Sequence, residues 1–342
     1  MQKTTYRDVV RMMSVLTFYK VYNAVLVWVS FHWSRLLGKP VVWGKPFSVS
    51  IEPTTACNLS CPECVSGLKA FTRPTGTASR TFFQEAVDGM ARELIYLNLY
   101  FQGEPYLNKD LFGMVEYASQ KGIYTSTSTN AHFLDDERAR KTVESGLARL
   151  IISIDGADQS TYAQYRKGGE LDKVIAGTRN LIRWKKALNS SSPMVVFQFL
   201  VVRHNEGQVD AIRELARELG VDKVWLKSAQ INDYAQDPHQ LIPTIAQYSR
   251  YKRDKQGKTV PVNTAPNQCW KMWHSNVVTW DGQVVPCCFD KDAQHPMGNL
   301  KGQPMQEIWE SKNYREFRQE LLKRRKNIDI CSNCSEGMNV WR

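Results

Sequence analysis

From residue 47 onward, short runs of β-branched and aromatic residues alternate with longer stretches in which apolar residues recur at the spacing of a helix. The short runs predict strands at 47–52, 95–101, 123–129, 150–154, 194–202 and 223–227. The longer stretches predict helices at 81–93, 109–120, 135–145, 172–188 and 207–219. This alternation is typical of a parallel sheet with right-handed crossovers, and six strands indicate an incomplete barrel or a doubly wound sheet.

The segments before and after this alternation have a different pattern. We therefore divide the chain into an N-terminal helical extension, the alternating α/β unit, a polar connector and a small C-terminal unit, at 1–46, 47–228, 229–262 and 263–342. In the C-terminal unit, Asp281-Gly282 predicts the turn of a hairpin. A basic helix is expected at 304–326.

The N-terminal extension contains an apolar run at 21–34 without Asp, Glu, Lys or Arg, which is shorter than the roughly 20 residues needed to cross a bilayer. Around it, the first 50 residues carry seven basic side chains and one acidic side chain, Asp8. A basic apolar helix with tryptophans is typical of attachment to an anionic membrane surface. The alternative is a helix packed on the core with a solvated basic face. Nucleic-acid binding is disfavoured, because no nucleic-acid-binding motif accompanies the charge.

Eight cysteines are present, and the first apolar run lacks the features of a signal peptide. In a reducing cytosol, clustered cysteines are better interpreted as metal ligands or catalytic groups than as disulfides. Three of them lie in TTACNLSCPEC, directly after the first predicted strand, at Cys57, Cys61 and Cys64. Chemistry in barrel-like parallel sheets gathers at the carboxyl ends of the strands. Three thiolates, where an iron–sulfur cluster normally has four, leave one iron open.

The C-x3-C-x2-C spacing in this position resembles the signature of the radical S-adenosylmethionine (SAM) superfamily. The resemblance implies a partial (β/α)6 TIM-like barrel, with Cys57, Cys61 and Cys64 holding a [4Fe-4S] cluster whose fourth iron binds SAM. It implies that an electron from a flavodoxin- or ferredoxin-type donor cleaves SAM. The resulting 5′-deoxyadenosyl radical then takes a hydrogen atom from a substrate C–H bond.

Further motifs match SAM-binding elements of the same family at successive strand ends. FQGEP (101–105) resembles the family's GGE element, although Gln102 replaces its first glycine. The residues that the resemblance assigns to SAM are Gly103, Glu104, Ser128, Asn130, Ser153, Asp155 and Arg166. Taken singly, each has an ordinary alternative as a turn or helix-cap residue. Glu63 stands where the family often has an aromatic residue, so stacking on adenine from that position is not expected.

The last quarter of the chain holds the other five cysteines. Their spacing resembles the twitch form of the SPASM extension, a small cysteine-rich iron–sulfur domain. The resemblance implies a second, auxiliary [4Fe-4S] cluster, held by Cys269, Cys287, Cys331 and Cys334. Cys288 either replaces Cys287 or is a buried free thiol. A structural zinc site with four cysteine ligands is the alternative.

An auxiliary cluster beside the substrate favours net oxidation, such as dehydrogenation or crosslink formation. The basic apolar extension suggests a lipid-linked or sugar-like substrate. Peptide or sulfatase maturation is the alternative, although only 46 residues precede the first strand, fewer than a peptide-recognition domain needs. Two non-catalytic alternatives are an electron carrier and a zinc-stabilised scaffold. The residues assigned to SAM argue against the electron carrier, because a carrier needs no SAM site. We expect a cytoplasmic enzyme that can attach to the inner face of the membrane.

Overall fold

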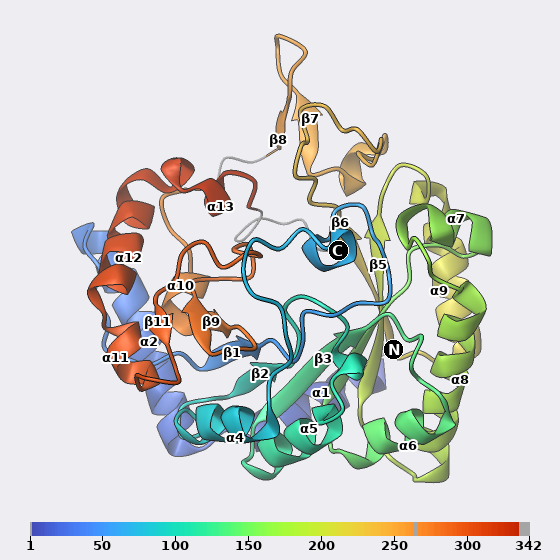
Figure 1. The fold of residues 1–342 in the computed structure, drawn as a ribbon, viewed down its shortest axis with the longest axis horizontal. Coiled ribbons are helices and arrows are strands. Elements are labelled where there is room, and N and C mark those ends of the chain that lie inside the picture. The colour runs from blue at the N-terminus through green and yellow to red at the C-terminus, as the bar shows by residue number, and fades with distance from the viewer. Residues whose placement is uncertain (1, 263–265, 335–342) are drawn as a thin grey trace.

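The computed structural model describes residues 2–262 and 266–334. Within them, nine strands form one sheet in the order β11-β10-β9-β1-β2-β3-β4-β5-β6 (Figure 1). The first six strands run parallel to their neighbours, as the sequence predicts. They are β1 (Ser48–Ile51), β2 (Tyr96–Asn98), β3 (Tyr124–Thr129), β4 (Arg149–Ser153), β5 (Met194–Val201) and β6 (Lys223–Ser228). The α/β partial-barrel prediction is confirmed.

Helices connect the parallel strands and cover the outer face of the sheet (Figure 1). The five predicted helices are α4 (Arg80–Asp88), α5 (Leu111–Gln120), α6 (Asp136–Glu144), α8 (Leu171–Ala187) and α9 (Val209–Leu219). Their buried faces pack against one face of the strands to form the main apolar core, and residues of the other face, such as Ile151 and Val196, form a smaller cluster. The sequence prediction missed α7 (Gln159–Tyr165), which is too short for a clear period. Short 3₁₀ helices cover Pro105–Leu107, Glu206–Gln208, Ala246–Tyr248 and Arg325–Asn327.

The N-terminal extension forms two helices, α1 (Gln2–Ser14) and α2 (Phe18–Leu37), whereas the sequence indicated one around 21–34. Asp8 of α1 accepts hydrogen bonds from the hydroxyl of Tyr124 and from Nη2 of Arg149, the latter at 2.6 Å. Tyr124 and Arg149 are the first residues of β3 and β4. The helix α1 therefore packs at the amino ends of the strands.

The C-terminal unit continues the barrel sheet, which the sequence analysis did not foresee. Its strands are β9 (Ser275–Val278), β10 (Gln283–Val285) and β11 (Gly298–Asn299). β9 pairs in parallel with β1, and β10 returns antiparallel to it after the predicted turn, where Gly282 has a φ of +92°. The buried valines of β9 and β10 explain why these strands join the barrel sheet, because they give the strands the apolar character of a sheet interior.

The helix predicted at 304–326 is interrupted in the structure. It is divided into α11 (Met305–Trp309) and α12 (Lys312–Arg324), because the hydroxyl of Ser311 accepts a hydrogen bond from the Tyr314 amide and starts a new helix. Two one-turn helices, α10 (Lys271–His274) and α13 (Asp329–Ser332), lie near the cysteines of this unit.

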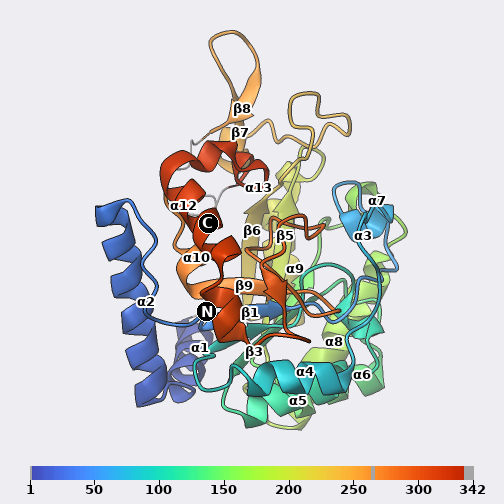
Figure 2. The same ribbon diagram turned by 60° about the vertical axis from the view of Figure 1, so that its left-hand side comes forward.

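The connector contains a hairpin that the sequence analysis missed. β7 (Tyr251–Arg253) and β8 (Thr259–Pro261) pair antiparallel and project from the body of the molecule (Figure 2). At its base the hydroxyl of Tyr251 donates a hydrogen bond to Oδ1 of Asn333 at 2.9 Å. The connector is therefore joined to the C-terminal unit at this point.

Candidate active site

The three front cysteines lie on the loop between the carboxyl end of β1 and the short helix α3 (Val65–Leu68). The Leu59 amide lies 3.5 Å from the Sγ of Cys57, and Nη1 of Arg166 lies 3.9 Å from the Sγ of Cys61. Burial raises the pKa of Cys57 to about 11, and it also raises the pKa of Cys61. These thiols become stable thiolates only beside positive charge, which a bound iron–sulfur cluster supplies.

The loop that carries the cysteines is held by close backbone packing against two glycines. Gly103 has a φ of +73°, and a Cβ built on it lies 2.3 Å from the Thr54 carbonyl oxygen. Its amide donates to the hydroxyl of Ser66 at 2.8 Å. Gly67 in α3 packs equally closely on the backbone of Cys61. Gly103 therefore positions the cysteine loop, a role that differs from the approach to a ligand expected from the sequence.

Neither Ser66 nor Gly67 was identified from the sequence. The only signal available was their place directly after the third cysteine, which does not distinguish them from other loop residues.

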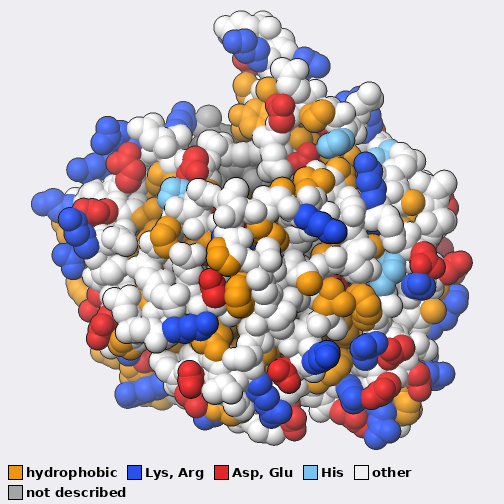
Figure 3. All heavy atoms as spheres, in the orientation of Figure 1, with side chains coloured by type: hydrophobic (Ala, Val, Ile, Leu, Met, Phe, Trp, Pro, Cys, Tyr) orange, Lys and Arg blue, Asp and Glu red, His pale blue; other side chains and the backbone are white. Residues whose placement is uncertain are grey.

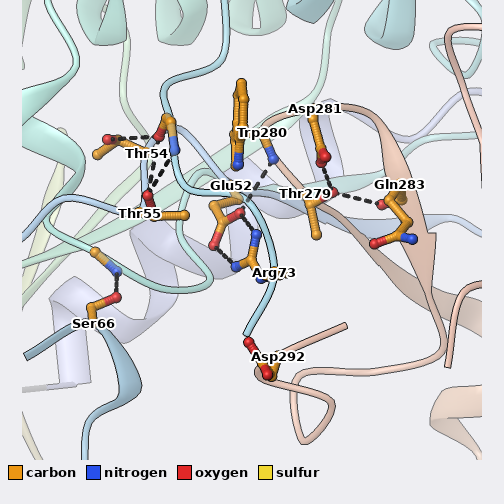
Figure 4. A network of polar contacts seen from close by, with 12 residues as sticks. Glu52, Thr54, Thr55, Ser66, Arg73, Thr279, Trp280, Asp281, Gln283 and Asp292 are labelled. Carbon is orange, nitrogen blue, oxygen red and sulfur yellow. Dashed lines mark hydrogen bonds and ion pairs between the residues drawn. The ribbon is translucent and has the colours of Figure 1, made fainter. Parts of the chain in front are cut away.

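A second polar network connects this loop to the C-terminal unit. Nη1 and Nη2 of Arg73 donate to both oxygens of Glu52, at 2.9 and 2.6 Å, as Figure 4 shows. The Trp280 amide, in the turn between β9 and β10, donates to the same carboxylate at 3.2 Å. The indole ring of Trp280 packs so closely against Gly76 that a Cβ added to this glycine would lie 2.6 Å from the ring. This buried ion pair fixes the loop after β1 relative to the C-terminal hairpin.

The side chain of Glu104 is fully inside the protein, at the end of β2. It accepts hydrogen bonds from the Thr129 hydroxyl and from the Asn130 amide, both at 2.7 Å. Burial raises the pKa of Glu104 to about 7 against the effect of these hydrogen bonds. The amide of Glu104 also donates to the carbonyl of Ala56 at 2.7 Å, next to Cys57. A buried carboxylate held in this way is suited to receive a cationic group.

Asn130 lies next to Glu104 at the carboxyl end of β3. Its Nδ2 donates to Oδ1 of Asn58, in the cysteine loop, at 2.7 Å. The sequence analysis did not single out Asn58. Ser128, two residues earlier, is half-buried, and within the described part of the chain its side chain makes no hydrogen bond. Of these two residues, Asn130 is the one that forms a side-chain hydrogen bond with the cysteine loop in the described structure.

At the end of β4, Asp155 and Arg166 form a buried ion pair in which Nε lies 2.5 Å from Oδ2. The other oxygen of Asp155 accepts the Leu200 amide at 2.7 Å. Asn205, which was not predicted, donates to the Asp155 carbonyl at 2.9 Å. Ser153 is buried and lies opposite Gln198 of β5. The ion pair of Asp155 and Arg166 thus connects the ends of β4 and β5 to the cysteine loop, because Arg166 also lies beside Cys61.

Three of the four cysteines predicted for the auxiliary cluster lie around Arg325, and the fourth, Cys287, lies near two of these three. Nη2 of this arginine lies 3.5 Å from the Sγ of Cys334, and its charge also interacts with Cys269 and Cys331. Burial raises the pKa of Cys287 and, to about 11, that of Cys331. Cys287 is buried and interacts electrostatically with Cys269 and Cys334. This donor set fits a four-thiolate cluster.

Cys288 lies in a different environment from Cys287. It is exposed, so the alternative that Cys288 is a buried free thiol is wrong, and its Sγ lies 3.6 Å from Nζ of Lys271. Across residues 2–262 and 266–334, no three His, Cys, Asp or Glu side chains lie close enough together to hold a single metal ion. A four-iron cluster needs a wider set, because each thiolate binds a different iron.

A cavity of 490 Å³ lies beside β5 and β6, and Tyr100, Gln198, Trp225 and Lys227 are among its lining residues. Burial lowers the pKa of Lys227, and three neighbouring cations act in the same direction. These cations are Arg250, Lys291 and Lys271. Lys291 also interacts with Cys64 and Cys288, so this positive region lies between the two sets of cysteines.

Comparisons with known protein families agree with this geometry. The model of the radical SAM superfamily matches residues 51–225, and the model of SPASM, an iron–sulfur cluster-binding domain, matches residues 269–335. The resemblance inferred from the cysteine spacing is thereby confirmed. Both domains imply [4Fe-4S] clusters, and the first implies SAM as well.

Solved structures with a similar fold come from the same group. BtrN in complex with AdoMet and 2-DOIA is 19% identical, with a TM-score of 0.54 over 85% of this chain and 94% of that one. The anSMEcpe structure with bound AdoMet is 18% identical, with a TM-score of 0.62 over 86% and 91%. SuiB from Streptococcus suis, bound to S-adenosylmethionine, is 12% identical, with a TM-score of 0.62 over 81% and 68%. At these identities the likeness shows the fold alone.

Proposed function

Since the chain belongs to the radical SAM superfamily and carries a SPASM iron–sulfur domain, we propose that it oxidises its substrate at an unactivated C–H bond. The substrate loses a hydrogen atom, and then one electron and one proton, which gives a dehydrogenated or crosslinked product. When bound, the front cluster with SAM supplies the 5′-deoxyadenosyl radical and the auxiliary cluster supplies one-electron oxidation.

The observation that carries this proposal is the arrangement of the cysteine loop. Cys57 lies near the buried anion Glu104, which follows β2, and Cys61 lies near the half-buried cation Arg166 at the end of α7. Cys57, Cys61 and Cys64 would hold the first cluster. The Glu104 carboxylate would receive the SAM ammonium, and the free edge of the Arg166 guanidinium would receive the SAM carboxylate. Asp155 orients that arginine through its ion pair.

The auxiliary site is built to hold negative charge close to the barrel. Cys269, Cys287, Cys331 and Cys334 would hold the second cluster, and Arg325 offsets the charge of their thiolates. Arg325 is itself fixed by a hydrogen bond from Nη1 to the Gln268 carbonyl at 2.7 Å. A buried cation that donates to a ligand sulfur raises the reduction potential of a cluster. This favours a cluster able to accept an electron.

For the substrate, we propose a sugar-like or lipid-linked molecule that carries an anionic group such as a phosphate. Support comes from the cavity beside β5 and β6, where the half-buried Lys227 lies near three other cations. Gln198 and Tyr100 line the same cavity and offer hydrogen-bonding groups to hydroxyls.

Peptide or protein modification is the second candidate. It is favoured by the fold shared with SuiB, which has also been solved bound to precursor peptide SuiA, and by the higher TM-scores of SuiB and anSMEcpe compared with BtrN. Sugar phosphates and short peptides, each supplied to the reconstituted enzyme, distinguish the two candidates by which one accelerates SAM cleavage.

Anaerobic reconstitution tests the proposed reaction. We expect about eight irons per chain, as two four-iron clusters require. After addition of dithionite and SAM, 5′-deoxyadenosine should accumulate, and it should not form in Cys57→Ala. The exposed thiol variant Cys288→Ala serves as the matched control and should keep both the iron and the activity. A colourless protein that binds zinc in place of iron would contradict the proposal.

A further inference from the structure

The helix α2 has its polar and apolar faces reversed relative to a helix on the surface of a water-soluble protein. Four of its buried residues are polar, namely Lys20, Asn23, Ser30 and Ser34. Nζ of Lys20 donates to the Gly122 carbonyl at 2.7 Å, and the hydroxyl of Ser34 accepts from the Trp273 indole at 3.2 Å. The hydrogen-bonding groups of α2 are thus used on the body of the protein.

The opposite side of α2, together with α1, exposes large apolar side chains. Phe18 is 89% exposed, Leu36 74% and Tyr6 70%, and Trp28 and Val25 are more than half exposed. On α2 these residues recur at helical spacing and form one stripe. We define the outward face by Tyr6, Met13, Phe18, Val25, Trp28 and Leu36. Figure 2 shows α2 at the edge of the molecule, with only one side toward the other elements.

The face of the molecule drawn in Figure 3 does not share this character. The face drawn in Figure 3 has charged side chains of both signs scattered among small apolar groups. An exposed apolar stripe along a helix of this length is unusual on a soluble monomer and indicates a binding partner.

Charge and composition identify the partner. Arg7, Arg35 and Lys39 are exposed on or beside the outward face, and Asp8, the one acid among the first 50 residues, is turned inward to Arg149. Trp28, Trp33 and Trp43 are exposed nearby, and tryptophan is enriched at the interface between membrane and water. A second copy of this chain fits less well, because a two-fold contact would bring the same basic residues together.

The structure also determines how such a surface would lie on a membrane. Within the described residues, no single helix is long and apolar enough to cross a bilayer. The helix pair Tyr6–Ser14 and Phe18–Leu37 has the length and composition of a membrane span only when both helices are taken together, and it is bent by 100°. Because Lys20, Asn23, Ser30 and Ser34 bind the body of the protein, α2 lies flat against it.

We propose that the outward face of α1 and α2 docks on the surface of an anionic lipid bilayer, with both helices lying along the interface and not across it. The apolar stripe enters the region between headgroups and acyl chains, and the basic residues contact the anionic headgroups. This docking is independent of the reaction proposed above, because it uses no residue of the cysteine sites.

Cosedimentation of the full-length, cluster-loaded protein with vesicles tests this proposal. We expect binding to vesicles of phosphatidylcholine with phosphatidylglycerol, weaker binding at high salt, and little binding to phosphatidylcholine alone. The variant Val25→Glu/Trp28→Glu/Leu36→Glu should bind at least about tenfold more weakly, because it removes buried apolar area and adds repulsion. The matched control Ile245→Glu, at an exposed isoleucine of the connector, should bind like the unaltered protein.

Iron content and thermal midpoint should be unchanged in the variants, and Trp28→Gln alone replaces the triple variant if the latter does not fold. Equal binding by the unaltered protein and the face variant would overturn the proposal. So would a dimer in lipid-free buffer that the face variant abolishes, since a second copy then covers the face.

Discussion

The Nε of Arg166 lies 2.5 Å from Oδ2 of Asp155, and this ion pair is almost completely enclosed by the protein. The pairing keeps the arginine extended toward the cysteine loop, where its Nη1 lies 3.9 Å from the Sγ of Cys61. One side chain thus connects a strand end to a thiol that we assign to the first cluster. Its charge therefore acts on both the proposed SAM site and the cluster.

Replacement Arg166→Gln should lower the rate of 5′-deoxyadenosine formation by at least about tenfold, because a charge-assisted contact to the SAM carboxylate is lost. The reduction potential of the front cluster should fall as well, since a cation near its thiolates is removed. SAM-dependent kinetics and a redox titration measure the two effects.

The neighbouring surface variant Lys167→Gln removes the same charge at an exposed position and should change neither quantity. Arg166→Lys should restore part of the potential without restoring the affinity for SAM, because lysine has no planar fork. If Arg166→Gln altered only the thermal midpoint, the arginine would be purely structural.

Glu104→Gln should weaken SAM binding by about 100-fold while iron content stays the same, because the proposed partner of the SAM ammonium loses its charge. An amide is nearly the same size, so the packing at the end of β2 is kept. Equilibrium binding of SAM to the cluster-loaded protein measures the effect. Glu116→Gln, at an exposed position on α5, is the matched control.

The raised pKa of Glu104 also predicts a pH dependence. In the folded protein this carboxyl is protonated below about 7, whereas in the unfolded chain it ionises near its ordinary value of 4.5. The folded state binds more protons between these values, so the contribution of Glu104 to stability decreases as pH rises through that window. The contact that we propose with the SAM ammonium needs the ionised form of Glu104, so the affinity for SAM should fall by up to about tenfold per pH unit below 7. In Glu104→Gln this part of the dependence should vanish.

The sequence predicted the six parallel strands and the helices between them, because both follow local periodicity. It could not predict that Ser275–Val278 pairs with Ser48–Ile51, since nothing local connects segments more than 200 residues apart. Periodicity also groups the residues of α2 by face without showing which face meets the body. The buried Lys20 and exposed Phe18 reverse the usual expectation.

In the candidate site too, some residues can be predicted from the local sequence pattern and others cannot. The cysteines and Glu104 belong to motifs with recognisable spacing. The residues that position them, such as Asn58, Gly67 and Asn205, act through single hydrogen bonds or close backbone contacts. Such contacts have no period along the chain, and loop residues of these types are common, so only the structure identifies them.

Gly103→Ala should prevent stable assembly of the front cluster. The new Cβ would lie 2.3 Å from the Thr54 carbonyl oxygen, and a non-glycine residue at this positive φ adds strain of about 1–3 kcal/mol. Gly122→Ala has a similar φ with nothing within 4 Å, so it should cost only about 1–2 kcal/mol and keep its iron. Iron analysis and thermal unfolding compare the two variants, and equal iron content in both would contradict the positioning role of Gly103.

The surroundings of Cys287 and Cys288 differ, and they support our assignment of Cys287 as the ligand. Cys287 is buried and interacts with Cys269 and Cys334, whereas Cys288 is exposed beside Lys271. Cys287→Ala should therefore reduce the iron content from about eight to about four per chain and remove the signal of the auxiliary cluster in electron paramagnetic resonance. Cys288→Ala should retain both clusters, because its thiol is exposed beside Lys271. Loss of four irons from Cys288→Ala alone would reverse the assignment, and it would place the auxiliary cluster closer to the cations around Lys227.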